Sequence, residues 1–89
     1  MGMSAALYSA ITFKGGAVEQ SNYSDFQVAT TANYPKKVNT YIAEPLEDYH
    51  AGGVGEPGLP PFAPALCNAI FAATGQRLRS MPFGDKIKV

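Results

Sequence analysis

The feature that most constrains the fold is a helix-forming segment, residues 61–75, that is apolar on nearly every side. Between Phe62 and Thr74 the only polar side chains are those of Asn68 and of Thr74 itself. Gly75 is placed to end the helix in a left-handed conformation. A surface helix carries a polar face opposite its apolar stripe, whereas a helix that is apolar all round is buried. The segment therefore predicts a helix that needs cover on several sides.

The rest of the chain is small for that task. Its 89 residues make one domain at most, and a domain of this size buries a smaller share of its surface than an average one. A few short strands can cover one face of the helix but not all of it. We therefore expect the chain to be a piece of a larger protein or an obligate oligomer. In the alternative, alanines form the outer face of the helix and tolerate exposure to water.

Composition argues against several classes of protein. Seven lysine and arginine residues balance seven aspartate and glutamate residues, and this net charge of zero argues against a nucleic-acid partner. The single cysteine, Cys67, rules out an intrachain disulfide, and we expect it to be a small core residue. His50 has no second histidine or cysteine at the spacing of metal ligands. No apolar run is long enough to predict a transmembrane helix.

Residues 1–44 are the strand-rich part of the chain. There are three candidate strands: 7–13, with a period-two pattern; 17–21, where Val18 lies among polar neighbours, with a continuation through Phe26 and Val28; and 37–43, again with a period-two pattern. Gly15 and Gly16 lie between the first two and can supply the positive φ angles of a tight hairpin. Residues 76–89 are predicted to be an extended tail with a candidate edge strand at its end, residues 86–89. The predicted fold is α+β: a small antiparallel sheet of about three strands, a long glycine/proline loop and one apolar helix.

The loop between sheet and helix, residues 45–60, is the candidate functional segment. Together with the first helical turn, it holds five of the seven prolines and four of the nine glycines. Glu56 is the only charged residue among the small residues 51–58. Residues 53–58 also satisfy the pattern G-x-G-x-x-G. A glutamate where phosphate would sit, followed by a proline without an amide donor, argues against a dinucleotide site.

Glu56 is the side chain that we single out for chemistry. We expect a carboxylate on such a loop, leading into an apolar helix, to be partly desolvated. Desolvation raises the pKa of a carboxyl group toward neutrality, which suits a general base. The alternative is an ordinary loop glutamate in water.

The sequence around this loop resembles a known enzyme family. The motif Gly52-Gly-Val-Gly-Glu-Pro-Gly-Leu-Pro-Pro61 and the apolar helix after it resemble the C-terminal end of the large, molybdenum-binding subunit of the xanthine dehydrogenase/aldehyde oxidase family. Residues 11–25 resemble the strand, turn and strand that precede this motif. Their portion 18–22 is most similar to the isoquinoline 1-oxidoreductase beta-subunit branch. The resemblance extends over residues 4–83.

The resemblance implies roles for four residues. Glu56 matches the family's general-base glutamate beside the molybdenum centre, and Gly53, Val54 and Gly55 let the backbone approach the cofactor. The implied cofactor is molybdopterin in its cytosine dinucleotide form, carrying molybdenum. The implied partners are the remainder of the large subunit, a small subunit with [2Fe-2S] centres, and an aldehyde or N-heterocyclic substrate.

The family's large subunit is many times longer than this chain. The resemblance therefore implies a C-terminal fragment of a larger molybdopterin-binding domain. We expect such a fragment on its own to hold no cofactor, to be inactive and to self-associate. A second hypothesis is a free-standing interaction or oligomerisation module without catalysis. The sequence indicates neither a cytoplasmic nor a periplasmic location.

Overall fold

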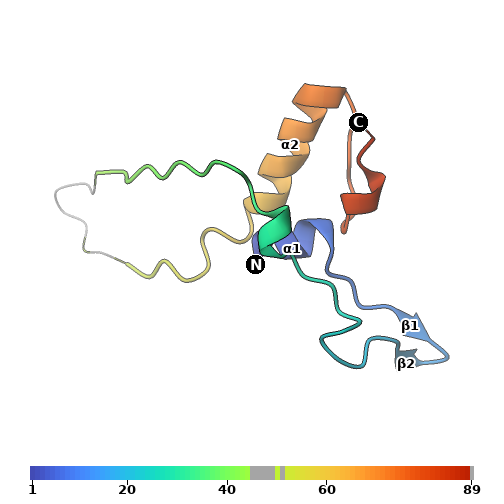
Figure 1. Ribbon diagram of the computed structural model, residues 1–89. Helices are drawn as coiled ribbons and strands as arrows, with labels where there is room; N and C mark the ends of the chain where they lie inside the picture. The colour runs from blue at the N-terminus through green and yellow to red at the C-terminus, as the bar shows by residue number, and fades with distance from the viewer. Residues whose placement is uncertain (45–49, 51, 89) are drawn as a thin grey trace.

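The computed structural model describes residues 1–44, 50 and 52–88. Within these residues it has two α-helices, a two-stranded antiparallel sheet and two short 3-10 helices, an α+β arrangement (Figure 1). In chain order the elements are α1 (Gly2–Leu7), β1 (Phe13–Lys14), β2 (Ala17–Val18), η1 (Thr31–Asn33), α2 (Phe62–Thr74) and η2 (Gly84–Lys86). Part of the predicted loop, residues 45–49 and 51, lies outside the described residues, as does Val89 of the predicted last strand.

Helices α1 and α2 pack together with residues 76–88, and we call these three segments the packed unit. Ala6 and Phe83 at its centre are fully buried, and Ile70 is 8% exposed. The amide of Phe83 donates a hydrogen bond of 2.9 Å to the carbonyl oxygen of Ala6. Partly buried apolar side chains surround this centre: Leu7, Phe62, Ala63, Leu66, Cys67, Leu78 and Ile87. Burial of these side chains is the main favourable term that holds the unit together.

The first helix, α1, differs from the sequence prediction of a strand beginning at residue 7. Its sequence, Gly-Met-Ser-Ala-Ala-Leu, contains several good helix formers. Ala6 lies at the contact of α1 with α2 and η2, where it is fully buried. Regular β pairing starts only at Phe13. The predictions of a strand over residues 7–13 and of a single helix are therefore wrong: burial of Ala6 favours a helix over residues 2–7, and residues 8–12 are irregular.

The glycine hairpin forms where the sequence predicts it. Gly15 has φ of 59° and Gly16 has φ of 82°, and Phe13 pairs with Val18 across the turn. Positive φ at both turn residues matches the right-handed twist of the two strands. Each strand is only two residues long, so the second strand is much shorter than the predicted 17–21 and its continuation.

Two further predicted strands do not form within the described part of the chain. Residues 37–43 have no regular secondary structure, and residues 86–88 comprise the end of η2 and two irregular residues. The observed sheet therefore has two strands rather than about three. A strand needs a neighbour for its backbone hydrogen bonds, and no described backbone group pairs with residues 37–43.

Helix α2 confirms the predicted helix, but not its complete burial. Gly75 ends it with φ of 73°, and the Gly75 amide donates to the carbonyl oxygen of Phe71 at 2.8 Å. Ile70 is the one buried residue of the helix. The outer face exposes four alanines: Ala65, Ala69, Ala72 and Ala73. The described chain thus covers one side of α2 and leaves the other exposed, as expected of a helix that these residues cannot cover alone.

The chain is far more open than a compact domain of its size. Its radius of gyration is 16.7 Å, against about 12 Å for a compact chain of 89 residues. Its accessible surface is 7884 Å², against about 5,000 Å² for a compact protein of the same mass. Figure 1 shows the cause: the β1–β2 hairpin and the segments on both sides of the grey trace project from the packed unit in different directions.

Candidate functional site

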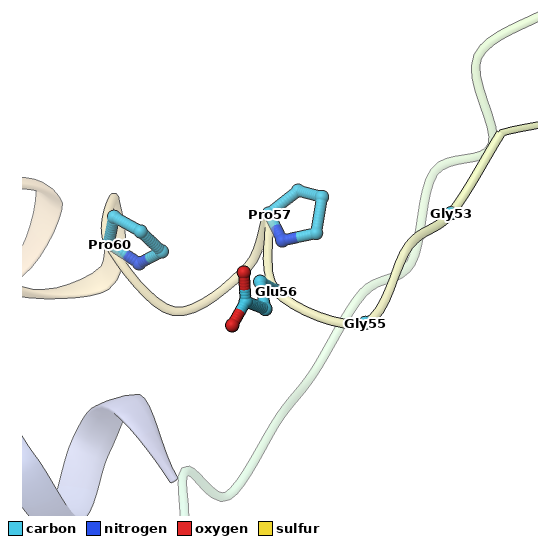
Figure 2. A pocket seen from close by; sticks show the side chains of 5 residues that line it. All are labelled: Gly53, Gly55, Glu56, Pro57 and Pro60. Carbon is cyan, nitrogen blue, oxygen red and sulfur yellow. The ribbon is translucent and has the colours of Figure 1, made fainter.

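Glu56 lies on the part of the loop that leads directly into α2 (Figure 2). The amide of Leu59 donates a hydrogen bond to the carbonyl oxygen of Glu56 at 2.9 Å. The amide of Phe62 donates one to the carbonyl oxygen of Leu59 at 3.4 Å. Two consecutive turns thus join the glutamate to the first residue of the helix. Pro57 and Pro60 fix φ within these turns. Because α2 belongs to the packed unit, the backbone of Glu56 is tied to the best-packed part of the chain.

Two shallow hollows meet at Glu56. One, of about 490 Å³, is lined by Gly53, Gly55, Glu56, Pro57 and Pro60 (Figure 2). The other, of about 530 Å³, is lined by Met1, Gly2, Val54, Gly55, Glu56, Gly58 and Leu59. The four predicted site residues, which are consecutive in the chain, line one or both of these hollows. The structure also places the start of α1 beside them, a neighbour that the sequence did not predict because no local pattern links such distant segments.

The carboxylate of Glu56 is exposed and accepts no hydrogen bond from the described residues. The partial desolvation expected from the sequence is therefore absent in this chain. Val54, Pro57, Leu59 and Pro60 line the hollows beside Glu56, yet the glutamate stays exposed. Desolvation of Glu56 requires cover from atoms that these residues do not supply.

The glycines of this loop have no explanation within the described chain. A Cβ at Gly52, Gly53 or Gly55 would meet nothing within 4 Å. Positive φ values among the described glycines occur only at Gly15, Gly16 and Gly75, which lie outside this loop. Glycine is required where another group must approach the backbone closely. The bare backbone around Glu56 therefore fits the close approach of a bulky group from outside the chain.

The described residues offer proton chemistry at this site rather than metal ligation. No three histidine, cysteine, aspartate or glutamate side chains among them are grouped closely enough to hold a metal ion. His50 is exposed, as expected of a residue without partner ligands. A molybdenum cofactor at this loop would thus meet glycine backbone and one carboxylate, and its metal would take its ligands from elsewhere.

Cys67 is a half-buried residue at the edge of the core, which confirms its prediction as a small packing residue. Cys67 lines a surface groove together with two arginines, Arg77 and Arg79. The guanidinium of Arg77 lies over the ring of Phe71, 3.5 Å from the centroid, and its Nη1 donates to Oδ1 of Asn68 at 3.4 Å. Arg77 is thus engaged by Phe71 and Asn68 rather than by the thiol. Neither described α-helix is long and apolar enough to cross a membrane.

Comparisons with known proteins relate the chain to one group of enzymes. It is 33% identical over 81 residues, 91% of the chain, to the isoquinoline 1-oxidoreductase subunit beta of Brevundimonas diminuta. It is 31% identical over 90 aligned residues, 97% of the chain, to a putative xanthine dehydrogenase molybdenum-binding subunit of Escherichia coli. It is 33% identical over 87 residues, 92% of the chain, to an aldehyde oxidoreductase molybdenum-binding subunit of Escherichia coli.

These matches cover nearly all of the chain but only 10–12% of each relative. The chain thus spans about a tenth of the length of the curated relatives that it matches. No family model matches it, and no solved structure matches it significantly. Over nearly its whole length, the chain is homologous to a segment of the molybdenum-binding subunits of the xanthine dehydrogenase/aldehyde oxidase family.

Proposed function

We propose that this chain is the C-terminal segment of a molybdenum hydroxylase and carries its general base, Glu56. One observation carries the proposal. In a chain homologous to molybdenum-binding subunits, the loop next to α2 presents the carboxylate of Glu56 among glycines that no described residue covers. An ordinary surface loop does not account for this arrangement. Each glycine raises the entropy cost of folding, so glycines are expected where a positive φ angle or the close approach of another group requires them.

The molybdenum cofactor, when bound, supplies the two-electron oxidation chemistry. The residues of this chain position a base and leave room for the cofactor. An Oε atom of Glu56 accepts a proton as the substrate is hydroxylated. The backbone at Gly53 and Gly55 carries no side chains that would hold the cofactor away, and the exposed side chain of Val54 lies between them.

Positioning of the base comes from the turns and the helix behind it. Pro57, Pro60 and the hydrogen bond from Leu59 to Glu56 restrict the backbone on the helix side of the glutamate. This matters because a displacement of about 1 Å at a reacting group can cost about a hundredfold in rate. Cover by the remainder of the subunit would remove water from the carboxylate and make it a better proton acceptor.

The resemblance also supplies the finer features of the proposal. The cofactor is the cytosine dinucleotide form of molybdopterin, electrons leave through [2Fe-2S] centres of a small subunit, and the substrate is an aldehyde or an N-heterocycle. The 89 residues alone hold no cofactor, are inactive and self-associate. The alternative, an interaction module without catalysis, would expose the same surface, but the three enzyme relatives favour a segment of the enzyme.

The test replaces Glu56 in the complete enzyme loaded with molybdenum. Glu56→Gln keeps the size of the side chain and removes its ability to accept a proton, so kcat should fall about 100- to 10,000-fold. Glu19→Gln, at an exposed glutamate next to the hairpin, is the matched control and should leave kcat unchanged. Molybdenum content is measured for each protein. Wild-type turnover by a fully loaded Glu56→Gln enzyme would show that the assignment is wrong.

A further inference from the structure

Residues 37–43 form an exposed, extended segment without partners. Val38 is 61% exposed, Tyr41 89% and Ile42 92%. None of the backbone amides or carbonyls of the segment is hydrogen bonded to another described residue. Figure 1 shows this stretch, green in the ribbon, projecting from the packed unit in a direction different from that of the hairpin.

The sequence of this segment is that of a half-buried β-strand. Val38, Thr40 and Ile42 fall on one face of a strand, and all three are β-branched. Lys37, Asn39 and Tyr41 fall on the other face, where polar groups can meet water. The pattern thus specifies one face to bury and one to expose, although the described chain supplies nothing to bury it against.

When this apolar face is buried, the backbone amides and carbonyls of the segment need hydrogen-bond partners, and this requirement decides the kind of partner. Covering Val38 and Ile42 takes the neighbouring backbone out of water, and an unpaired buried amide or carbonyl costs about 1–3 kcal/mol. A helix or a smooth apolar surface cannot satisfy those groups. The edge of a β-sheet can, because it presents a row of unpaired donors and acceptors at the matching spacing.

We propose that residues 37–43 pair as a strand with the edge of a β-sheet in the part of the molybdenum-binding subunit that lies outside these 89 residues. The proposal rests on the proposed function, because the relatives of this chain have about nine tenths of their length outside the matched segment. That length, and the large accessible surface of the chain, favour this partner over a second copy. The segment remains an edge strand, since Pro35 and two lysines, Lys36 and Lys37, resemble the residues that protect sheet edges from further pairing.

The test uses an intact related subunit in which the matching segment is replaced by the residues of this chain. Residue-level hydrogen–deuterium exchange is measured on this full-length chimera and on the 89-residue chain. In an edge strand only alternate amides bond to the neighbour. In the chimera, amides of either the even or the odd residues of 38–43 should therefore exchange more than about tenfold slower than in the chain alone.

A pair of proline variants of the chimera gives a second readout. Asn39→Pro and Thr40→Pro each remove one amide donor, from opposite alternating sets. One variant should lower the thermal midpoint of the chimera by several degrees, and the other should stay close to the parent. Equal stability of both variants, or equal loss in both, would overturn the assignment as an edge strand.

The outcomes separate this proposal from the one on which it rests. A chimera that is soluble and loaded with molybdenum, but without alternate protection at residues 38–43, overturns the strand pairing and leaves the proposed function standing. A chimera that neither folds nor binds molybdenum overturns both. Alternate protection that appears in the 89-residue chain as it dimerises identifies a second copy as the partner, and overturns the partner proposed here.

Discussion

The packed unit differs from the two projecting segments, residues 8–30 and the described part of 35–60 (35–44, 50 and 52–60), in how its side chains are packed. In the packed unit the position of each element follows from burial around Phe83. In the second projecting segment none of the backbone groups of residues 37–43 is hydrogen bonded to another described residue. In the first, large apolar side chains such as Tyr23, 95% exposed, lie in water, and local hydrogen bonds supply its order. Such bonds include the pair between Thr12 and Gln20, each 2.8 Å long.

This difference shows what the chain can and cannot do alone. The packed unit has its own core, whereas the projecting segments have the patterns of buried structure without the neighbours that would bury them. Glu56 lies at the boundary between the two, on a projecting segment but only a few residues before α2. The chain itself can thus position the backbone of the proposed base, while its cover must come from outside.

The largest effect that separates the two regions should come from a pair of phenylalanines. Phe83 is fully buried and Phe13 is 71% exposed. Phe83→Ala should cost about 3–5 kcal/mol of unfolding free energy, most of the stability that a chain this small and open can have. Circular dichroism at 222 nm during urea unfolding should show loss of the cooperative transition for Phe83→Ala and little change for Phe13→Ala. Similar losses from both substitutions would contradict the division into packed and projecting regions.

A smaller effect should come from a pair of glycines. A Cβ at Gly84 would lie 2.6 Å from the carbonyl oxygen of Leu7, a backbone atom that must shift, whereas a Cβ at Gly55 would meet nothing within 4 Å. Gly84→Ala should lower the unfolding free energy by about 1–3 kcal/mol through overpacking. Gly55→Ala should leave it unchanged or raise it by less than about 1 kcal/mol.

The glycine pair also bears on the proposed site. Urea unfolding of the 89-residue chain measures the change in stability. The activity of the complete enzyme measures whether the bare backbone at Gly55 is needed for turnover. There Gly55→Ala should reduce turnover although it leaves the isolated chain intact, because its methyl group would face the cofactor. A Gly84→Ala chain with wild-type stability would show that α1 and η2 do not pack as closely as the structure has them.

Short sequence patterns correctly predicted those parts of the fold that depend only on neighbouring residues. The Gly15-Gly16 turn and the Gly75 helix end both depend on positive φ, which only glycine adopts readily, and both form as predicted. The helix over Phe62–Thr74 follows from its own composition. These features need no knowledge of distant neighbours.

The predictions that failed depend on distant neighbours. Residues 2–7 form a helix because Ala6 packs against α2 and Phe83, which no period-two pattern near residue 7 can reveal. The strand over residues 37–43 has the right pattern but no partner in the described chain. At the candidate site Glu56 is exposed, so the desolvation predicted from the sequence is absent among the described residues, and its cover by a larger subunit belongs to the proposal.

The smallest effect should come from Asp25, which orders the turn of one projecting segment. Its Oδ2 accepts hydrogen bonds from the amide and hydroxyl of Ser21 at 2.8 and 2.9 Å, and its Oδ1 accepts one from the amide of Asn22 at 2.9 Å. The pKa of Asp25 is lowered from its usual 3.8, first by the Ser21 amide, then by the Asn22 amide and the Ser21 hydroxyl. Because the ordered turn binds a proton less readily than the unfolded chain, its stabilisation is complete above pH 3.8 and is lost as the pH falls through the lowered pKa.

The change should be confined to residues 21–25 and should leave the packed unit folded, since the carboxylate is fully exposed and far from the core. A ¹³C NMR titration of the Asp25 carboxyl should give a midpoint below 3.8, with the Ser21 and Asn22 amide shifts moving together with it. Asp25→Asn should abolish the titration and leave the resonances of Ala6 and Phe83 in place. A midpoint at or above 3.8, or unfolding of α2 in the same pH range, would mean that the two regions are coupled and that the projecting segment is not ordered by its local hydrogen bonds alone.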